Sequence, residues 1–253
     1  MSVLPICITG EPVLHRIADP VERFDSSLTD LVADMIDTMH EAPGVGLAAP
    51  QVGVGLQLFV WSYRGGGPFD RRYRDALALD RAPTLGFNDA MSGVVVNPTL
   101  DLVWDEAGAG AILSAQPDIA DEAEGCLSVP GVTYPLRRAL GAILRGYDAN
   151  GRPITVAARG WLARIFQHEY DHLRGTLYVD RLEEPYGQMA AELAHSKGWG
   201  RPDTRGPRGS EPKPPLPGSV TRGVSQWTSK PSERKYSRTS SVASGVGAFA
   251  SSS

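Results

Sequence analysis

Residues 161–173 read WLARIFQHEYDHL, and this stretch decides which fold the rest of the chain builds. Trp161, Ile165, His168 and His172 recur at the spacing of one face of an α-helix. The last two belong to an H-E-x-x-H pattern, whose i, i+4 spacing turns both imidazoles to the same side, where they can bind one metal ion. Glu169 lies beside them and is free to act as a base. We therefore predict a metal-binding helix over 161–173.

The segments upstream of this helix alternate between helical and strand patterns. Ser27-Leu28-Thr29-Asp30 has the form of a capping box, and the helical spacing that follows stops at Pro43-Gly44. Asn150-Gly151 favours a turn between two strands. The expected strands cover 56–61, 94–96, 142–147 and 154–157. We predict an α+β fold, a single catalytic domain in which short mixed or antiparallel strands pack around the H-E-x-x-H helix.

A catalytic metal usually has three protein ligands, so the two histidines require a partner elsewhere. Glu183 and Glu184 are the nearest downstream carboxylates. Cys126 is the other candidate, because it stands in a short glycine-led segment rather than in an apolar run. A lone intracellular cysteine is more often a buried small hydrophobe than a ligand. The residues alone leave the third ligand open.

Composition separates an acidic body from a basic tail. The 253 residues carry a formal net charge of −4, with 15 Lys+Arg against 26 Asp+Glu in 1–196 and 10 against 3 in 197–253. Such a body argues against duplex DNA binding, which requires a basic face. Two cysteines, no recognisable signal peptide and no long apolar run predict a reducing, cytoplasmic setting without a membrane span.

The same patterns divide the chain into a catalytic domain over 1–196 and a tail over 197–253. In the tail, Ser, Gly and Pro make up 27 of 57 residues, too polar a composition for a packed core, so we expect it to be disordered and solvated. Residues 62–93 contain three consecutive glycines and little periodicity. We expect a surface excursion there.

Three motifs taken together resemble a known family. GVGLAAPQ at 44–51, EGCLS at 124–128 and QHEYDH at 167–172 are similar, in this order, to the signature motifs of peptide deformylases. The resemblance extends from about Ile8 to about Leu182. It implies a metal-dependent hydrolase that removes the formyl group from the N-terminal formylmethionine of nascent polypeptides and releases formate.

The resemblance also implies a role for each motif residue. Cys126, His168 and His172 would bind one divalent metal, usually Fe²⁺ and often replaced by Zn²⁺, Ni²⁺ or Co²⁺. Glu169 would move the proton, while the Gln51 side chain and the Leu127 backbone N–H would stabilise the oxyanion. The catalytic set also includes Gly46, which would keep its loop open. The extended substrate would contact Val45, Gly46, Glu124, Gly125 and Ile165.

Two other hypotheses remain at this stage. An H-E-x-x-H metalloprotease would cleave internal peptide bonds, but no histidine follows His172 at the spacing of the longer protease motif. A catalytically idle relative would bind ribosomes or RNA through the basic tail. The expected partners of an active deformylase are formylated nascent chains and, transiently, the ribosome, with no DNA and no membrane.

Overall fold

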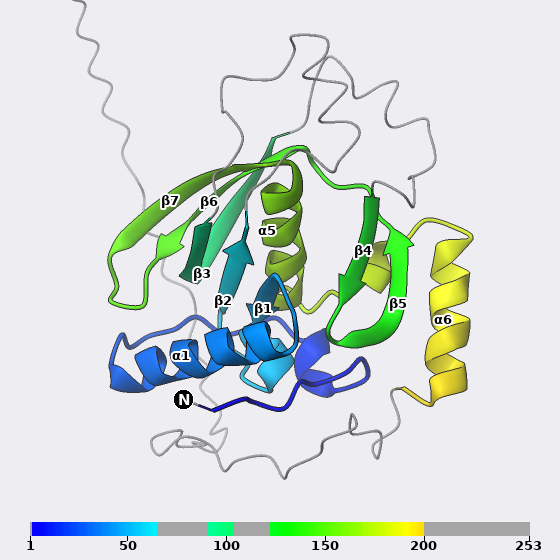
Figure 1. Cartoon of the computed structure of the whole chain (residues 1–253), viewed down its shortest axis with the longest axis horizontal. Helices are drawn as coiled ribbons and strands as arrows, with labels where there is room; N and C mark the ends of the chain where they lie inside the picture. The colour runs from blue at the N-terminus through cyan, green and yellow to red at the C-terminus, as the bar shows by residue number, and fades with distance from the viewer. Residues whose placement is uncertain (1, 65–90, 104–121, 200–253) are drawn as a thin grey trace, which may run out of the picture. The chain divides into compact units, whose positions relative to one another are not determined.

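A five-stranded antiparallel sheet supports the fold, in the strand order β1-β2-β3-β6-β7 (Figure 1). The computed structural model describes residues 2–64, 91–103 and 122–199. The strands of this sheet are β1 (Gly46–Ala48), β2 (Leu58–Tyr63), β3 (Met91–Val103), β6 (Gly141–Tyr147) and β7 (Pro153–Arg159). A separate two-stranded antiparallel sheet joins β4 (Ala123–Cys126) to β5 (Val129–Pro135).

Helix α5 (Gly160–Leu173) lies between the two sheets, directly after β7 (Figure 1). Its apolar face packs on the larger sheet in a buried cluster that includes Phe59, Trp61, Leu144 and Phe166. Trp61 and Phe166 meet edge to face, with ring centroids 5.1 Å apart. This packing fixes the rotation of α5, so its opposite face turns toward β4 and β5. The predicted helix over 161–173 and the α+β fold class are confirmed, with α5 beginning one residue earlier.

Two further helices and three 3-10 turns complete the described part of the chain. They are η1 (Pro12–His15), α1 (Ser26–Glu41), η2 (Ala49–Val52), η3 (Tyr178–Arg181) and α6 (Tyr186–Lys197). Helix α1 packs through Leu28, Val32, Met35 and Met39 against β1, β2 and η2. Turns η1 and η3 and helix α6 share a third buried cluster with β4 and β5.

The start of α1 differs from the prediction. Asp25 is the N-cap, its carboxylate accepting the backbone N–H of Ser27, so Ser27 lies inside the helix and is not its cap. The predicted capping box was therefore wrong by two residues. Asp25 is a good cap because its short side chain reaches the unpaired amides of the first turn.

The hairpin predicted at Asn150-Gly151 is confirmed, with β6 and β7 paired over their whole length. The predicted excursion at 62–93 is partly wrong. Residues 62–63 continue β2, and residues 91–93 begin β3, paired with it. Residues 65–90 and 200–253 lie outside the described part of the chain. The tail was predicted to begin at residue 197, but Lys197 is the last residue of α6, so the helix crosses the predicted boundary by one residue. Among the described residues, no helix is both long enough and apolar enough to cross a membrane.

Candidate active site

A cleft of about 410 Å³ opens between β1, β4, β5 and α5. Ten of the predicted site residues line it, namely Val45, Gly46, Gln51, Glu124, Gly125, Cys126, Leu127, Ile165, His168 and Glu169. His172 lies next to the cleft and is buried. Strand β1 is an edge of the larger sheet and β4 belongs to the smaller one, so each contributes backbone to the cleft. The structure thus brings together residues that the sequence separates by more than 100 positions.

Cys126, His168 and His172 converge on one point, since their ligand atoms all lie within 4.8 Å of one another. The Sγ of Cys126 is 3.3 Å from Nε2 of His172. The two histidines project from successive turns of α5, with ring centroids 5.1 Å apart. A thiolate and two imidazoles are donors that suit iron and zinc better than magnesium or calcium. This group can hold one metal ion.

The alternative third ligands lie elsewhere. Glu183 and Glu184 are exposed, and Glu183 lines a second cavity of about 470 Å³ together with Arg174 and Arg181. The structure therefore favours Cys126 over both glutamates as the partner of the two histidines.

The amide of Gln51 points at the same centre. Its Oε1 accepts the backbone N–H of Ala48 at 2.8 Å, which assigns the opposite end of the amide as the NH₂ group. That Nε2 lies 3.6 Å from the Sγ of Cys126 and 3.3 Å from the Oγ of Ser128. A buried donor is thus aimed at the space beside Cys126.

Glu169 presents a buried carboxylate to the cleft. Its side chain is only 4% exposed, and its Oε2 has no hydrogen-bond partner among the described residues. Burial raises the pKa of Glu169 to about 7. A Cβ built on Gly46 would lie 2.3 Å from Oε1 of Glu169. Gly46 therefore makes room for this carboxylate. Its predicted role of keeping the loop open stays a prediction.

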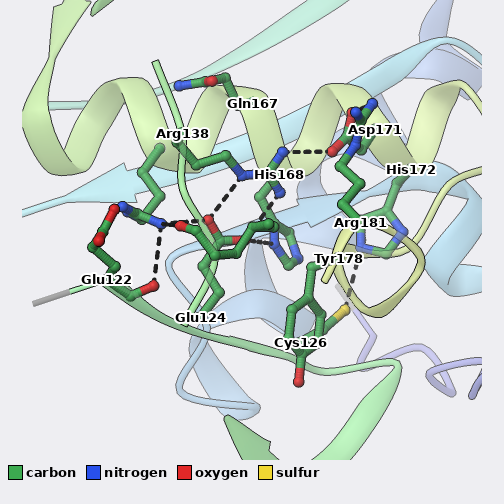
Figure 2. A network of polar contacts seen from close by, with 12 residues as sticks. Glu122, Glu124, Cys126, Arg138, Gln167, His168, Asp171, His172, Tyr178 and Arg181 are labelled. Atoms are coloured by element: carbon green, nitrogen blue, oxygen red, sulfur yellow. Dashed lines mark hydrogen bonds and ion pairs between the residues drawn. The ribbon is translucent and has the colours of Figure 1, made fainter. Parts of the chain in front are cut away.

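An ion-pair network contacts the Nδ1 side of the His168 imidazole (Figure 2). Glu124 accepts from Arg138 through both oxygens at 2.9 Å and lies 3.1 Å from Nδ1 of His168. Arg138 in turn donates to Asp171 at 2.6 Å, and Asp171 accepts from Arg181 at 2.7 Å. Burial opposes ionisation of Glu124, but Arg138 and His168 outweigh it and hold its pKa well below the usual range.

This network was not predicted, and it changes how Glu124 is understood. Arg138, Arg164 and His168 occupy both oxygens of the Glu124 carboxylate, so this side chain is not available for the predicted substrate contact. Arg138, Arg164 and Asp171 are all buried, yet neither hydrophobic periodicity nor the H-E-x-x-H pattern marks them. The one available signal was the presence of charged residues in otherwise apolar segments, which becomes informative only when the partners are known.

The residues present fit a metal ion. Glu124 on Nδ1 of His168 leaves Nε2 for a metal, an arrangement in which a carboxylate orients the imidazole and increases its basicity. Glu169 follows His168 in the chain, and its Oε2 has no partner among the described residues, so this oxygen is free to accept a proton. A metal centre with an adjacent base suits hydrolysis of an amide. Fold and site together place the chain in the class of metal-dependent hydrolases.

Comparison with known proteins narrows this class. The family model described as polypeptide deformylase matches residues 3–187, and the chain belongs to the peptide deformylase family. These metal-dependent enzymes remove the N-formyl group from nascent peptides. The predicted family and activity are confirmed.

Individual relatives match over most of their length. A peptide deformylase of Tropheryma whipplei (strain TW08/27) is 41% identical over 209 residues, covering 79% of this chain and 91% of the relative. One from Mycolicibacterium smegmatis is 41% identical over 219 residues, covering 85% and 98%. The crystal structure of the Ehrlichia chaffeensis enzyme aligns with a TM-score of 0.60 at 31% identity, covering 80% and 99%.

Proposed function

We propose that Cys126, His168 and His172 bind one divalent metal ion and that Glu169 and Gln51 complete the catalytic set for deformylation. The observation that carries this proposal is the convergence of the three ligand atoms within 4.8 Å, together with the buried carboxylate of Glu169, whose Oε2 has no partner among the described residues. When bound, the metal supplies Lewis-acid activation of the attacking water and polarises the formyl carbonyl.

The protein's own groups then carry the proton and the charge. Glu169 accepts a proton from the water as the oxygen attacks the formyl carbon, and it later delivers that proton to the amine nitrogen as the C–N bond breaks. The Gln51 NH₂ and the backbone N–H of Leu127 donate to the oxyanion that forms on the formyl oxygen. Donors of this kind contribute about 2.7–4 kcal/mol each in comparable sites. Formate and a peptide with a free amino terminus leave.

The substrate binds by strand addition in this proposal. Edge strand β1 and the edge of β4 both lie along the cleft, at Gly46 and Gly125. Main-chain hydrogen bonds to such edges hold peptides of any sequence, while a side-chain pocket selects one residue. We assign that pocket to Val45 and Ile165, which line the cleft and are respectively 48% and 4% exposed.

We propose Fe²⁺ as the native metal, with Zn²⁺, Ni²⁺ or Co²⁺ as replacements. The soft thiolate of Cys126 supports iron or zinc, and the choice of iron rests on the resemblance of the motifs to the family. Metal analysis of protein purified without oxygen tests this choice. Zinc as the metal of a fully active preparation would contradict it.

The substrate class also predicts where the protein acts. Nascent chains are made in the cytoplasm, where we expect the reaction, and transient contact with the ribosome remains a prediction.

The crystallised Ehrlichia chaffeensis enzyme was solved in complex with actinonin. We expect actinonin to bind to this protein in the cleft between β1, β4, β5 and α5 and to block formate release.

The decisive experiment measures formate release from formyl-Met-Ala-Ser, with metal content determined on the same sample. We expect about one metal per chain and activity that a chelator abolishes. Glu169→Ala should retain the metal and lose turnover by about 100-fold or more, because the base and the ligands are separate residues. Loss of metal in this variant would contradict the division of roles. Cleavage of internal peptide bonds without formate release would favour a protease.

A further inference from the structure

Tyr178 contacts the metal centre without belonging to the ligand set or to the cleft lining. It begins η3, five residues after the end of α5, and its side chain is 1% exposed. Its ring stacks on the imidazole of His168, with centroids 6.0 Å apart and planes inclined by 28°. Figure 2 shows the ring of Tyr178 beside Cys126 and close to the imidazole of His168. The proposed mechanism gives this residue no role.

The ring of Tyr178 and the turn that carries it are each anchored by a hydrogen bond. Its hydroxyl donates to the backbone carbonyl of Val132 at 3.2 Å, which ties it to strand β5. At the other end of the same turn, Arg181 donates to Asp171 at 2.7 Å, which ties η3 to α5. A buried ring that is bonded to a strand and carried by a turn tied to α5 can act as a rigid surface for a third group.

The imidazole of His168 needs such a surface. The contact from Nδ1 to Glu124 fixes the direction of one nitrogen but leaves the ring free to tilt about the line joining the two atoms. A flat contact on the ring face removes this remaining freedom. Because Nδ1 and Nε2 belong to one rigid ring, fixing the plane also fixes the direction of the Nε2 lone pair.

We propose that Tyr178 is a positioning residue for the metal centre, which holds the plane of the His168 imidazole and so directs its Nε2 at the metal. This inference rests on the proposed ligand set. Groups that orient a ligand from behind commonly change metal affinity by about 10–100-fold when they are removed. Tyr178 therefore contributes to metal retention although it donates no atom to the metal.

The test measures metal affinity directly, with Zn²⁺ in competition with a chromogenic chelator and with the visible absorption of the Co²⁺-loaded protein. Tyr178→Leu removes the flat surface, and we expect its Kd for Zn²⁺ to rise by about 10-fold or more. Its Co²⁺ absorption bands should shift, since the donor geometry changes. Tyr178→Phe keeps the ring and loses only the anchor, so its Kd should rise by less than that of the leucine variant.

Tyr134 provides a matched control. It lies in the same buried cluster, is 8% exposed and packs on Tyr186, with ring centroids 5.9 Å apart. Tyr134→Leu should lower the denaturation midpoint through the same kind of core loss and leave the Kd for Zn²⁺ and the Co²⁺ spectrum unchanged. A spectral change confined to Tyr178 variants separates positioning from general destabilisation.

Three results would overturn the inference. One is a Tyr178→Leu protein that binds Zn²⁺ as tightly as the unaltered protein, and another is a Tyr134→Leu protein that loses as much affinity. The third is a Tyr178→Phe protein whose Kd for Zn²⁺ is higher than that of the leucine variant. None of these measurements uses a formylated peptide. Failure of the proposed function itself would appear separately, as an unaltered protein that binds no Zn²⁺ at all.

Discussion

Glu169 and Gly46 lie 123 positions apart in the sequence, yet the position of one depends on the other. The buried carboxylate occupies the volume that any side chain at position 46 would need. The glycine of β1 thus determines whether the proposed base of α5 can stand at its working position. A sequence motif reports each of them, but only the structure shows that one requires the other.

Gly46→Ala should therefore lower formate release without loss of the metal. Its Cβ would displace the Glu169 carboxylate or strand β1, and a displacement of about 1 Å at a reacting group can reduce the rate by about 100-fold. The measurement is kcat/KM together with metal content. Gly55→Ala is the control, because its Cβ would meet only Val13, at 4.0 Å. Normal activity of Gly46→Ala would show that this close approach has no catalytic meaning.

The buried charged residues near His168 stabilise the fold as ion pairs. Asp171 bridges Arg138 and Arg181, and Asp171→Asn would leave buried positive charge with less compensation. Breaking a buried pair of this kind costs about 3 kcal/mol or more, so the free energy of unfolding should fall by that amount in urea titrations.

Asp101→Asn provides the comparison, because Asp101 and Arg145 form an ion pair whose side chains are 64% and 47% exposed. We expect this variant to change stability by less than about 1 kcal/mol. Equal effects of the two substitutions would mean that burial does not decide the value of the Asp171 contacts.

Among the elements, regular periodicity decided which ones could be predicted. Helices α1 and α5 each present one continuous apolar face, and the β6–β7 hairpin carries a strong turn signal at Asn150-Gly151. Strands β1 and β4 were not predicted, because three or four residues rich in glycine show no alternation. Helix α6 was missed because only Ala190 of its 12 residues is buried, which leaves no apolar face to recognise.

The helix cap at Asp25 carries a pH-dependent prediction. Hydrogen bonds from Ser27 lower the pKa of Asp25, so the folded state prefers the ionised cap. The Asp25 carboxylate therefore contributes its full stabilisation above its ordinary pKa of 3.8. This contribution is lost as the pH falls through the lower pKa that Asp25 has in the folded protein. Asp25→Ala should lower the thermal midpoint at pH 7, and the gap to the unaltered protein should narrow below about pH 4. A gap that widens in acid would contradict this account.

For the whole molecule, we propose that 1–196 forms the catalytic domain and that the tail is dispensable for catalysis. Every proposed site residue lies in 45–172, and the family model ends at residue 187. A protein that ends at Trp199 keeps all of α6 and should show unchanged formate release and metal content. Loss of activity on this truncation would assign the tail a catalytic role. Loss of ribosome cosedimentation alone would assign it to a partner.

The three proposed ligands come from separately packed parts of the domain. Cys126 ends β4, which packs with β5 and α6, whereas the histidines belong to α5, which packs on the larger sheet. A metal bound by all three would act as a cross-link that closes a loop of more than 40 residues, as a disulfide does in secreted proteins. Removal of the metal by a chelator would then both abolish activity and weaken the packing between the two sheets. The lifetime of the protein against cellular proteases would follow the supply of metal.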